Sequence, residues 1–263
     1  MRRAAALAFS LCALPAAAAA EGYAEVRSPR GVTVPVWHGA PAAPWAAAVL
    51  LPGGGGALEL EPGGIGRMRA NTVVRARGLL AGAGIAFAIP DAPSDRGDLA
   101  NFRLTARHAA DLGAVVAWLR ERHPGIPVWM IGISRGAISA AAAAARLGPP
   151  PTGPDGVVLL AAVTGATSWG GDTVLDAALD RIRVPALVVH HARDGCEVSP
   201  LPGARTVLRR LRHAPRRELI VLRGGDDEDV NPCRARTHHG FLGLERELVR
   251  RVAAWMRAAA GAQ

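Results

Sequence analysis

The chain of 263 residues contains no lysine and a single tyrosine, and aromatic residues make up only 4% of it. All 31 basic residues are therefore arginines, and the net charge at pH 7 is +9. Such a charge often indicates a nucleic-acid or anionic-membrane partner. Here the arginines are scattered without a basic tail or stripe, and few aromatic side chains are available to stack on bases. We therefore expect a solvated basic surface and no nucleic-acid partner.

The sequence also lacks an apolar run convincing enough for a membrane span. Its N-terminus has Arg2 and Arg3, an apolar stretch over 4–14, and a small-residue tract that ends at Ala20 before Glu21. This order is typical of a secretory signal peptide, and the absence of a polar face argues against a buried helix. We therefore expect a signal peptide over residues 1–20, a single domain over 21–263, and a periplasmic or secreted bacterial protein without membrane insertion.

Cysteine is scarce, with three residues in the chain. Cys12 lies inside the predicted signal peptide and would leave with it. A lipoprotein cysteine is the alternative, but the preceding Leu11 is large where that processing prefers a small residue. The mature chain then keeps Cys196 and Cys233, and in an exported protein such a pair predicts one disulfide bond.

Short runs rich in Val, Ile and Ala alternate with longer amphipathic segments, which predicts a mostly parallel sheet covered by helices on both faces. Eight strands are expected, at 23–26, 32–37, 45–51, 85–89, 128–133, 157–162, 186–190 and 218–222. The first two are separated by a turn-like stretch that suits an antiparallel hairpin. Helices are expected at 65–82, 102–122, 135–147, 175–181, 203–213 and 241–259.

The segment Gly132-Ile133-Ser134-Arg135-Gly136 stands between a predicted strand and an alanine-rich helix. In the pattern G-x-S-x-G the serine occupies a strained turn that exposes its hydroxyl at the top of a sheet, and the glycines allow close backbone approach. The backbone N–H of Arg135 then lies at a helix N-terminus, where it can stabilise an oxyanion. Ser134 is therefore a candidate nucleophile.

A serine nucleophile needs a base that is oriented by an acid. In chain order the acid and then the histidine should follow the serine. Asp194 follows the strand at 186–190, and His238 and His239 precede the last predicted helix. Asp172 is a competing acid in an earlier loop, whereas His108 on a core-facing helix stripe is expected to be a core residue.

Three motifs, G-I-S-R-G at 132–136, A-R-D-G at 192–195 and H-H-G-F at 238–241, resemble those of the α/β-hydrolase family, and the element order matches from about residue 23 to 259. The resemblance implies that fold, and it assigns the base to His239 rather than His238. It also places a second oxyanion donor in the loop after the third strand, where Pro52 replaces the family's usual histidine. The Gly54 amide is the expected donor and Gly55 the alternative.

The same resemblance implies a serine esterase that forms an acyl-enzyme. The short spacing from Ser134 to Asp194 leaves little room for a large lid, so we expect an open pocket for small or soluble esters, lined by loops at 91–96 and 167–170. A serine peptidase or amidase and a thioesterase are alternatives on the same fold. A binding protein on an inactive hydrolase scaffold is a further alternative, but it would be expected to lack a triad residue.

Cys196 lies two residues after Asp194, and Cys233 lies six residues before His239. A bond between them would join the acid loop to the base loop and contribute roughly 3–4 kcal/mol by loop closure. The acidic run at 226–229 resembles a cation site, but such runs are usually solvated. We expect neither a metal ion nor a cofactor, and the four-glycine loop has no Gly-Lys-Ser/Thr sequence that would bind phosphate.

Overall fold

A computed structural model describes residues 20–166 and 171–261. Eight strands form one sheet in the order β1-β2-β6-β3-β7-β8-β9-β10. β1 and β2 form an antiparallel hairpin and β2 runs antiparallel to β6, while all other neighbours are parallel. The mostly parallel sheet and its initial hairpin are therefore as predicted. The strands are β1 (Ala20–Arg27), β2 (Thr33–Ala40), β3 (Ala46–Leu51), β6 (Ile85–Pro90), β7 (Val128–Ile133), β8 (Gly156–Leu160), β9 (Ala186–His191) and β10 (Arg217–Leu222).

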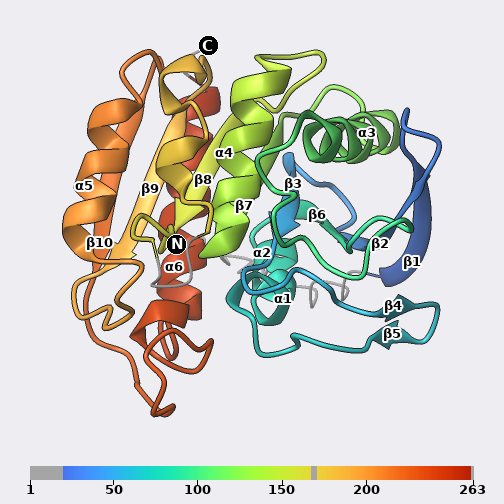
Figure 1. Ribbon diagram of the computed structural model, residues 1–263. Coiled ribbons are helices and arrows are strands. Elements are labelled where there is room, and N and C mark those ends of the chain that lie inside the picture. Colours follow the sequence, from blue (N-terminus) through green and yellow to red (C-terminus); the bar gives the residue numbers. More distant parts are fainter. Residues whose placement is uncertain (1–19, 167–170, 262–263) are drawn as a thin grey trace, which may run out of the picture.

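Both faces of the sheet are covered by helices (Figure 1). In the central strand β7, Val128 and Met130 pack into one core cluster, whereas Trp129, Ile131 and Ile133 pack into the other. This alternation follows from the two-residue period of a strand, and burial on both sides requires apolar residues at every position. One cluster contains α3 (Ala106–Arg122), α4 (Arg135–Leu147) and α5 (Leu201–Arg210), and the other contains α1 (Thr72–Arg75), α2 (Arg77–Gly82) and α6 (Glu245–Ala260).

Several predicted helix boundaries were wrong. The helix expected over 65–82 begins only at Thr72 and is divided into α1 and α2, and a small hairpin of β4 (Leu60–Glu61) and β5 (Gly64–Ile65) precedes it. The segment expected at 175–181 forms two 3-10 turns, η1 (Val174–Asp176) and η2 (Leu179–Arg181), because Ala178 between them has φ +50°. The last helix begins at Glu245 instead of 241, since Phe241 is also left-handed with φ +57°. A left-handed residue cannot continue a right-handed helix.

Two other helices differ from their predicted bounds by a few residues. α3 begins four residues later than expected because Thr105 caps it, and the Thr105 hydroxyl accepts a hydrogen bond from the N–H of His108. α5 lies two to three residues upstream of its predicted position, with Pro200 at its N-cap.

The carboxyl ends of the parallel strands meet at one edge of the sheet, where ligands bind in open α/β folds. Between β8 and β9, described residues 161–166 and 171–185 contain only η1 and η2, so this part of the chain forms no large lid. The predicted signal peptide up to residue 19 and the predicted pocket loop at 167–170 lie outside the described residues. No described helix has the length and apolar character that a membrane crossing requires.

Candidate active site

Ser134 is the only residue between the end of β7 and the start of α4. Its backbone has φ +55° and ψ −123°, a strained conformation for a residue with a side chain. The Ser134 N–H donates to the Leu160 carbonyl of β8 at 2.9 Å, so the strained turn is anchored to the sheet. The turn therefore holds the hydroxyl at the carboxyl edge, next to the N-terminus of the 13-residue helix α4.

The two glycines that flank this turn are required by backbone contacts. A Cβ atom on Gly132 would lie 2.2 Å from the carbonyl oxygen of Gly136. A Cβ atom on Gly136 would lie 2.0 Å from the carbonyl oxygen of Leu51, at the end of β3. Both distances are far below van der Waals contact, and carbonyl groups in adjoining elements cannot move aside cheaply. The pattern G-x-S-x-G is thus explained by packing of the turn against α4 and β3.

His239 and Asp194 come together from segments that are 45 residues apart. The Nδ1 atom of His239 lies 2.9 Å from Oδ2 of Asp194, and the other carboxylate oxygen accepts a hydrogen bond from the Cys196 N–H at 2.9 Å. Both side chains are almost completely buried. Nε2 of His239 is also buried and has no hydrogen-bond partner among the described residues. This nitrogen is available to a group that enters the neighbouring cavity.

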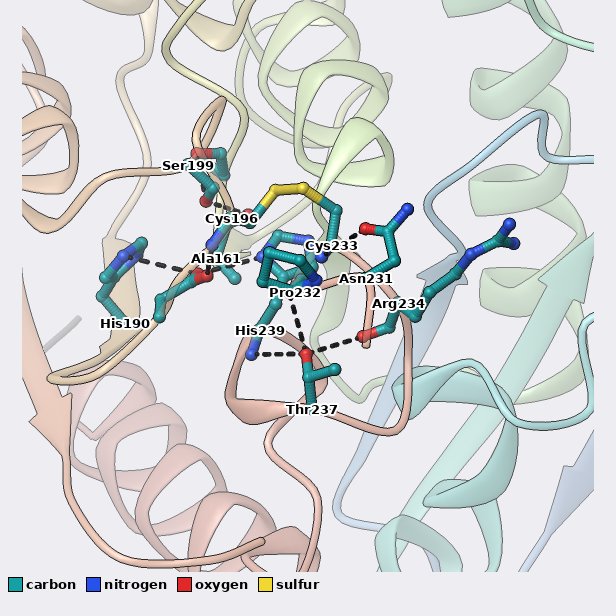
Figure 2. Close-up of a disulfide and its surroundings, with 12 residues drawn as sticks. Ala161, His190, Cys196, Ser199, Asn231, Pro232, Cys233, Arg234, Thr237 and His239 are labelled. Atoms are coloured by element: carbon teal, nitrogen blue, oxygen red, sulfur yellow. Dashed lines mark hydrogen bonds and ion pairs between the residues drawn. A yellow bond between two sulfur atoms is a disulfide. The ribbon is translucent and has the colours of Figure 1, made fainter. Parts of the chain in front are cut away.

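The loop that carries His239 is held by Thr237 beneath it. The Thr237 hydroxyl donates to the carbonyls of Pro232 and Arg234 and accepts the N–H of His239 (Figure 2). Gly240 follows in the same turn, η3 (His238–Gly240), where a Cβ would lie 2.0 Å from the Ala235 carbonyl oxygen. These contacts fix the backbone on both sides of the imidazole.

A second support of this loop comes from two residues of α1. The guanidinium of Arg75 donates to the carbonyls of Ala235 and Gly240, and it forms an ion pair with Glu245 at 2.7 Å. The Thr72 hydroxyl donates to the same Gly240 carbonyl at 2.6 Å. The position of His239 therefore depends on α1 as well as on its own loop.

The glycine-rich loop after β3 is held by a buried guanidinium. Arg103 is only 4% exposed and donates to the Gly54 carbonyl at 3.1 Å, with longer contacts to the carbonyls of Pro52 and Gly53. In a planar trans peptide the N–H points opposite to the preceding carbonyl. Contacts to the Gly53 and Gly54 carbonyls therefore direct the N–H groups of Gly54 and Gly55 away from Arg103. The amides of Gly54 and Gly55, the two predicted candidate donors, both meet this requirement.

Arg103 has no carboxylate within 4 Å in the described part of the chain. Burial lowers the pKa of its guanidinium to about 9, so the group is still protonated at neutral pH. Its other nitrogen donates to the Ser139 hydroxyl at 2.8 Å, which also lies 2.9 Å from Nε2 of His108. Burial, followed by the charge of Arg103, lowers the pKa of His108 to about 3. His108 is thus a neutral, buried residue of α3.

Cys196 and Cys233 form a disulfide bond that joins the loop after β9 to the loop after β10 (Figure 2). Cys196 is buried, and its N–H is bonded to Asp194. Cys233 lines the same cavity as His239. The bond therefore connects the segment that carries the acid to the segment that carries the histidine.

Two cavities meet at Ser134. One, with a volume of about 310 Å³, is lined by Ser134, His239 and Thr72 of α1, and we call it the His239 cavity. The other, of about 500 Å³, is lined by Arg135, Asp172 and the disulfide, and we call it the Arg135 cavity. Gly54, Ser134 and Cys233 line both cavities. Each cavity lies within the size range of small-molecule sites.

Some predicted site features lie elsewhere. Asp172 lines the Arg135 cavity, whereas the carboxylate that contacts His239 is that of Asp194. The loop at 91–96 was expected to line the pocket, but it lines neither cavity. Its Asp91 carboxylate instead accepts the backbone N–H groups of Leu58 and Leu60 and so holds the chain after the glycine-rich loop. In the acidic run, Asp227 contacts His238 and Glu228 contacts Arg236. The described residues contain no cluster of three metal-ligating side chains.

Sequence reasoning missed Arg103, Arg75, Thr72 and Thr237. Each acts through a backbone carbonyl or N–H that is distant in sequence or that belongs to an irregular loop. Of these four, Thr237 could have been found from a local pattern, because a threonine two residues before a histidine can cap the turn that carries it.

Solved structures that share this architecture include three whose functions are described. An esterase from an Arctic intertidal metagenomic library is 17% identical, with a TM-score of 0.62 over 94% of this chain and 99% of that one. An esterase of Pyrococcus furiosus is 15% identical, with a TM-score of 0.64 over 92% and 93% of the two chains. A dienelactone hydrolase of Anabaena variabilis is 16% identical, with a TM-score of 0.63 over 92% and 99%.

No protein-family model and no curated protein sequence matches the chain. At these identities the structural likeness establishes the fold. The protein has the α/β-hydrolase fold, as predicted, and the described residues carry no large lid.

Proposed function

We propose that the protein is an exported serine hydrolase that cleaves carboxylic esters of small or soluble substrates. The observation that carries this proposal is the hydrogen bond from His239 Nδ1 to Asp194 Oδ2. An imidazole that donates Nδ1–H to a carboxylate has its basic lone pair on Nε2, and this atom adjoins the cavity that Ser134 also lines.

In the proposed reaction, Nε2 of His239 takes the proton from the Ser134 hydroxyl as the serine oxygen attacks the ester carbonyl. Asp194 stabilises the imidazolium that forms. The backbone N–H groups of Arg135 and Gly54 donate to the oxyanion. The tetrahedral intermediate collapses, the imidazolium gives its proton to the leaving alkoxide, and the alcohol departs. Water, deprotonated by His239, then attacks the acyl-enzyme, and the protonated histidine returns the proton to Ser134 as the acid leaves.

The two cavities support the substrate class. Ser134 lines both of them, so one can accept the acyl group and the other the alcohol. Both are partly open to solvent, and the His239 cavity has the charged residues Asp229, Arg234 and Arg236 in its lining. These charged residues and the modest volumes favour a soluble ester over bulk lipid. The structural neighbours include proteins described as esterases, which supports the same reaction class.

Export is part of the proposal. The N-terminal sequence has the order of charged, apolar and small residues that signal peptides share. The disulfide is consistent with an oxidising compartment such as the periplasm or the exterior. No nucleic-acid partner, cofactor or metal ion is needed for the proposed chemistry.

The test is labelling with a fluorophosphonate probe, followed by hydrolysis of a panel that contains p-nitrophenyl acyl esters, an acyl thioester and aminoacyl anilides. Ser134→Ala should remove labelling and lower kcat by at least about 10⁴-fold. Ser94→Ala is the matched control, since Ser94 is an exposed serine that lines neither cavity. Faster turnover of the anilides or of the thioester would favour a peptidase or a thioesterase. Absence of labelling in the native protein would favour an inactive-scaffold binding protein.

A further inference from the structure

A second histidine faces the acid of the Asp194–His239 pair. His190, the penultimate residue of β9, is completely buried, and its Nε2 lies 3.6 Å from Oδ2 of Asp194. This is the same oxygen that lies 2.9 Å from Nδ1 of His239. The two imidazoles reach it from different segments, β9 and the loop after β10. Oδ2 of Asp194 thus lies close to a nitrogen of each of two imidazoles.

Neither ring nitrogen of His190 makes a hydrogen bond of normal geometry among the described residues, and the other polar group beside the ring is the Ser199 backbone. A buried polar nitrogen without a partner is costly, and a residue that only filled space at this point would be expected to be apolar. The remaining carboxylate oxygen of Asp194 is already bonded to the Cys196 N–H. Of the two carboxylate oxygens, Oδ2 is therefore the one that faces His190.

The protonation state of His190 follows from its surroundings. The titratable groups that face it are Asp194, His239 and His191. Burial lowers the pKa of His190, and the opposing effects of the Asp194 charge and of the Ser199 backbone do not reverse that direction. The ring is thus neutral near neutral pH. A neutral imidazole has one N–H. When this hydrogen is on Nε2, the ring can donate it to the carboxylate without adding a second positive charge beside Asp194.

We propose that His190 is a positioning residue for the acid: its Nε2–H donates to Oδ2 of Asp194 and holds the carboxylate turned toward His239. The proposal rests on the serine hydrolase function proposed above. At 3.6 Å the contact is longer than a hydrogen bond. Catalytic contacts in unliganded sites are often long and tighten when substrate binds. No proton is transferred to or from His190 in this role.

Loss of this donor should affect the base through the acid. The Asp194 carboxylate would be free to rotate, so it would no longer hold the His239 imidazole in one orientation. The expected result is a lower kcat, because small displacements within a triad are costly in rate.

The experiment compares His190→Gln with His190→Met. The glutamine Nε2 reaches about as far as the histidine Nε2 and keeps a donor, whereas methionine has a similar shape without one. We expect His190→Gln to retain kcat within about threefold and His190→Met to lose about tenfold or more, with little change in KM, because small displacements in a triad are costly. Thermal unfolding of both variants separates this loss from a change in stability. Equal kcat in the two variants would overturn the proposal.

A second measurement is independent of turnover. In Ser134→Ala protein, the NMR signal of the proton on Nδ1 of His239 reports its hydrogen bond to Asp194, and we expect a weaker hydrogen bond with Met at position 190 than with Gln. The nitrogen shifts of His190 itself, measured without any change at that position, should show a neutral ring protonated on Nε2. A ring protonated on Nδ1 would overturn the proposal even if the methionine variant failed to fold. If the native protein hydrolysed no ester, the proposed function would fail while the NMR result would still decide the role of His190.

Discussion

The carboxylate of Asp227 lies 3.0 Å from Nδ1 of His238, so the histidine next to His239 has an acid partner of its own. Nε2 of His238 lies 3.0 Å from a guanidinium nitrogen of Arg193, which can only donate, so Nε2 must accept. His238 also stacks on His191, with ring centroids 4.5 Å apart. Both nitrogens of His238 are thus engaged, whereas Nε2 of His239 is left for the cavity.

This difference predicts the effects of removing each ring. His239→Ala should lower kcat by about 10⁴-fold, nearly as much as the loss of the serine, because the members of a triad act as a unit. His238→Ala should lower kcat by less than about tenfold, since it removes contacts that hold the loop and leaves Nε2 of His239 in place. Steady-state hydrolysis of p-nitrophenyl acetate measures both. The reverse ranking would assign the base to His238.

Arg103 should affect the reaction without contacting the substrate. In Arg103→Met, the carbonyls of the glycine-rich loop lose their buried donor, and the neighbouring N–H groups lose their fixed direction. Loss of one oxyanion donor typically lowers kcat by about 10²–10³-fold. We expect a fall toward that range, with KM changed little, and a cost of about 1–3 kcal/mol from the unpaired carbonyls. Steady-state kinetics and urea unfolding measure the two quantities. Native kcat in a folded variant would contradict the role.

Reduction of the disulfide should act on the site before it acts on the sheet. The bond joins the loops of Asp194 and His239, while the core strands are buried independently of it. Small displacements within a triad are costly in rate, and loops open more easily than cores. We expect activity to fall at lower reductant concentrations than the helical circular dichroism signal. Activity that survives complete reduction would leave the bond with a structural role only.

A thiol count provides the control for that experiment. The chain that begins at Glu21 contains two cysteines, Cys196 and Cys233. When it is produced in an oxidising compartment and then denatured without reductant, we expect no reactive thiol. Two reactive thiols per chain would exclude the bond in the protein as produced.

His108 predicts a pH dependence of stability. Its pKa is about 3 in the folded protein against 6.5 as the reference value, because burial disfavours the charged ring. Between these values the unfolded chain binds a proton that the native state does not, so stability falls as pH falls, by about 1.4 kcal/mol per pH unit. From pH 6.5 to pH 5 the loss due to His108 is about 2 kcal/mol. His108→Gln, which can keep the contact with Ser139, should lose correspondingly less. Urea unfolding at pH 7 and pH 5 checks this, and parallel losses in the two proteins would contradict it.

The sequence by itself determined which segments form the eight strands of the main sheet, and it determined the turn at Ser134. Both depend on local patterns. Apolar runs of strand length alternate with helical segments, and Gly132 and Gly136 permit a close approach that any residue with a Cβ would block. The chain order of Ser134, Asp194 and His239 also follows from the sequence. Local backbone conformation was harder to predict. The left-handed Ala178 divides one expected helix and the left-handed Phe241 delays the start of another, although alanine favours helices and phenylalanine is tolerated in them.

The tertiary structure decided which groups meet. The choice of Asp194 over Asp172 as the partner of His239, the pairing of His238 with Asp227, and the placement of His190 against Asp194 all depend on side chains from different loops and strands. The anchoring of the glycine-rich loop by Arg103 joins residues 49 apart. Hydrophobic periodicity tells which face of an element is buried, but not which element lies opposite. Polar contacts in this site are short and directional, so they are set only when the packed sheet brings its loops together at one edge.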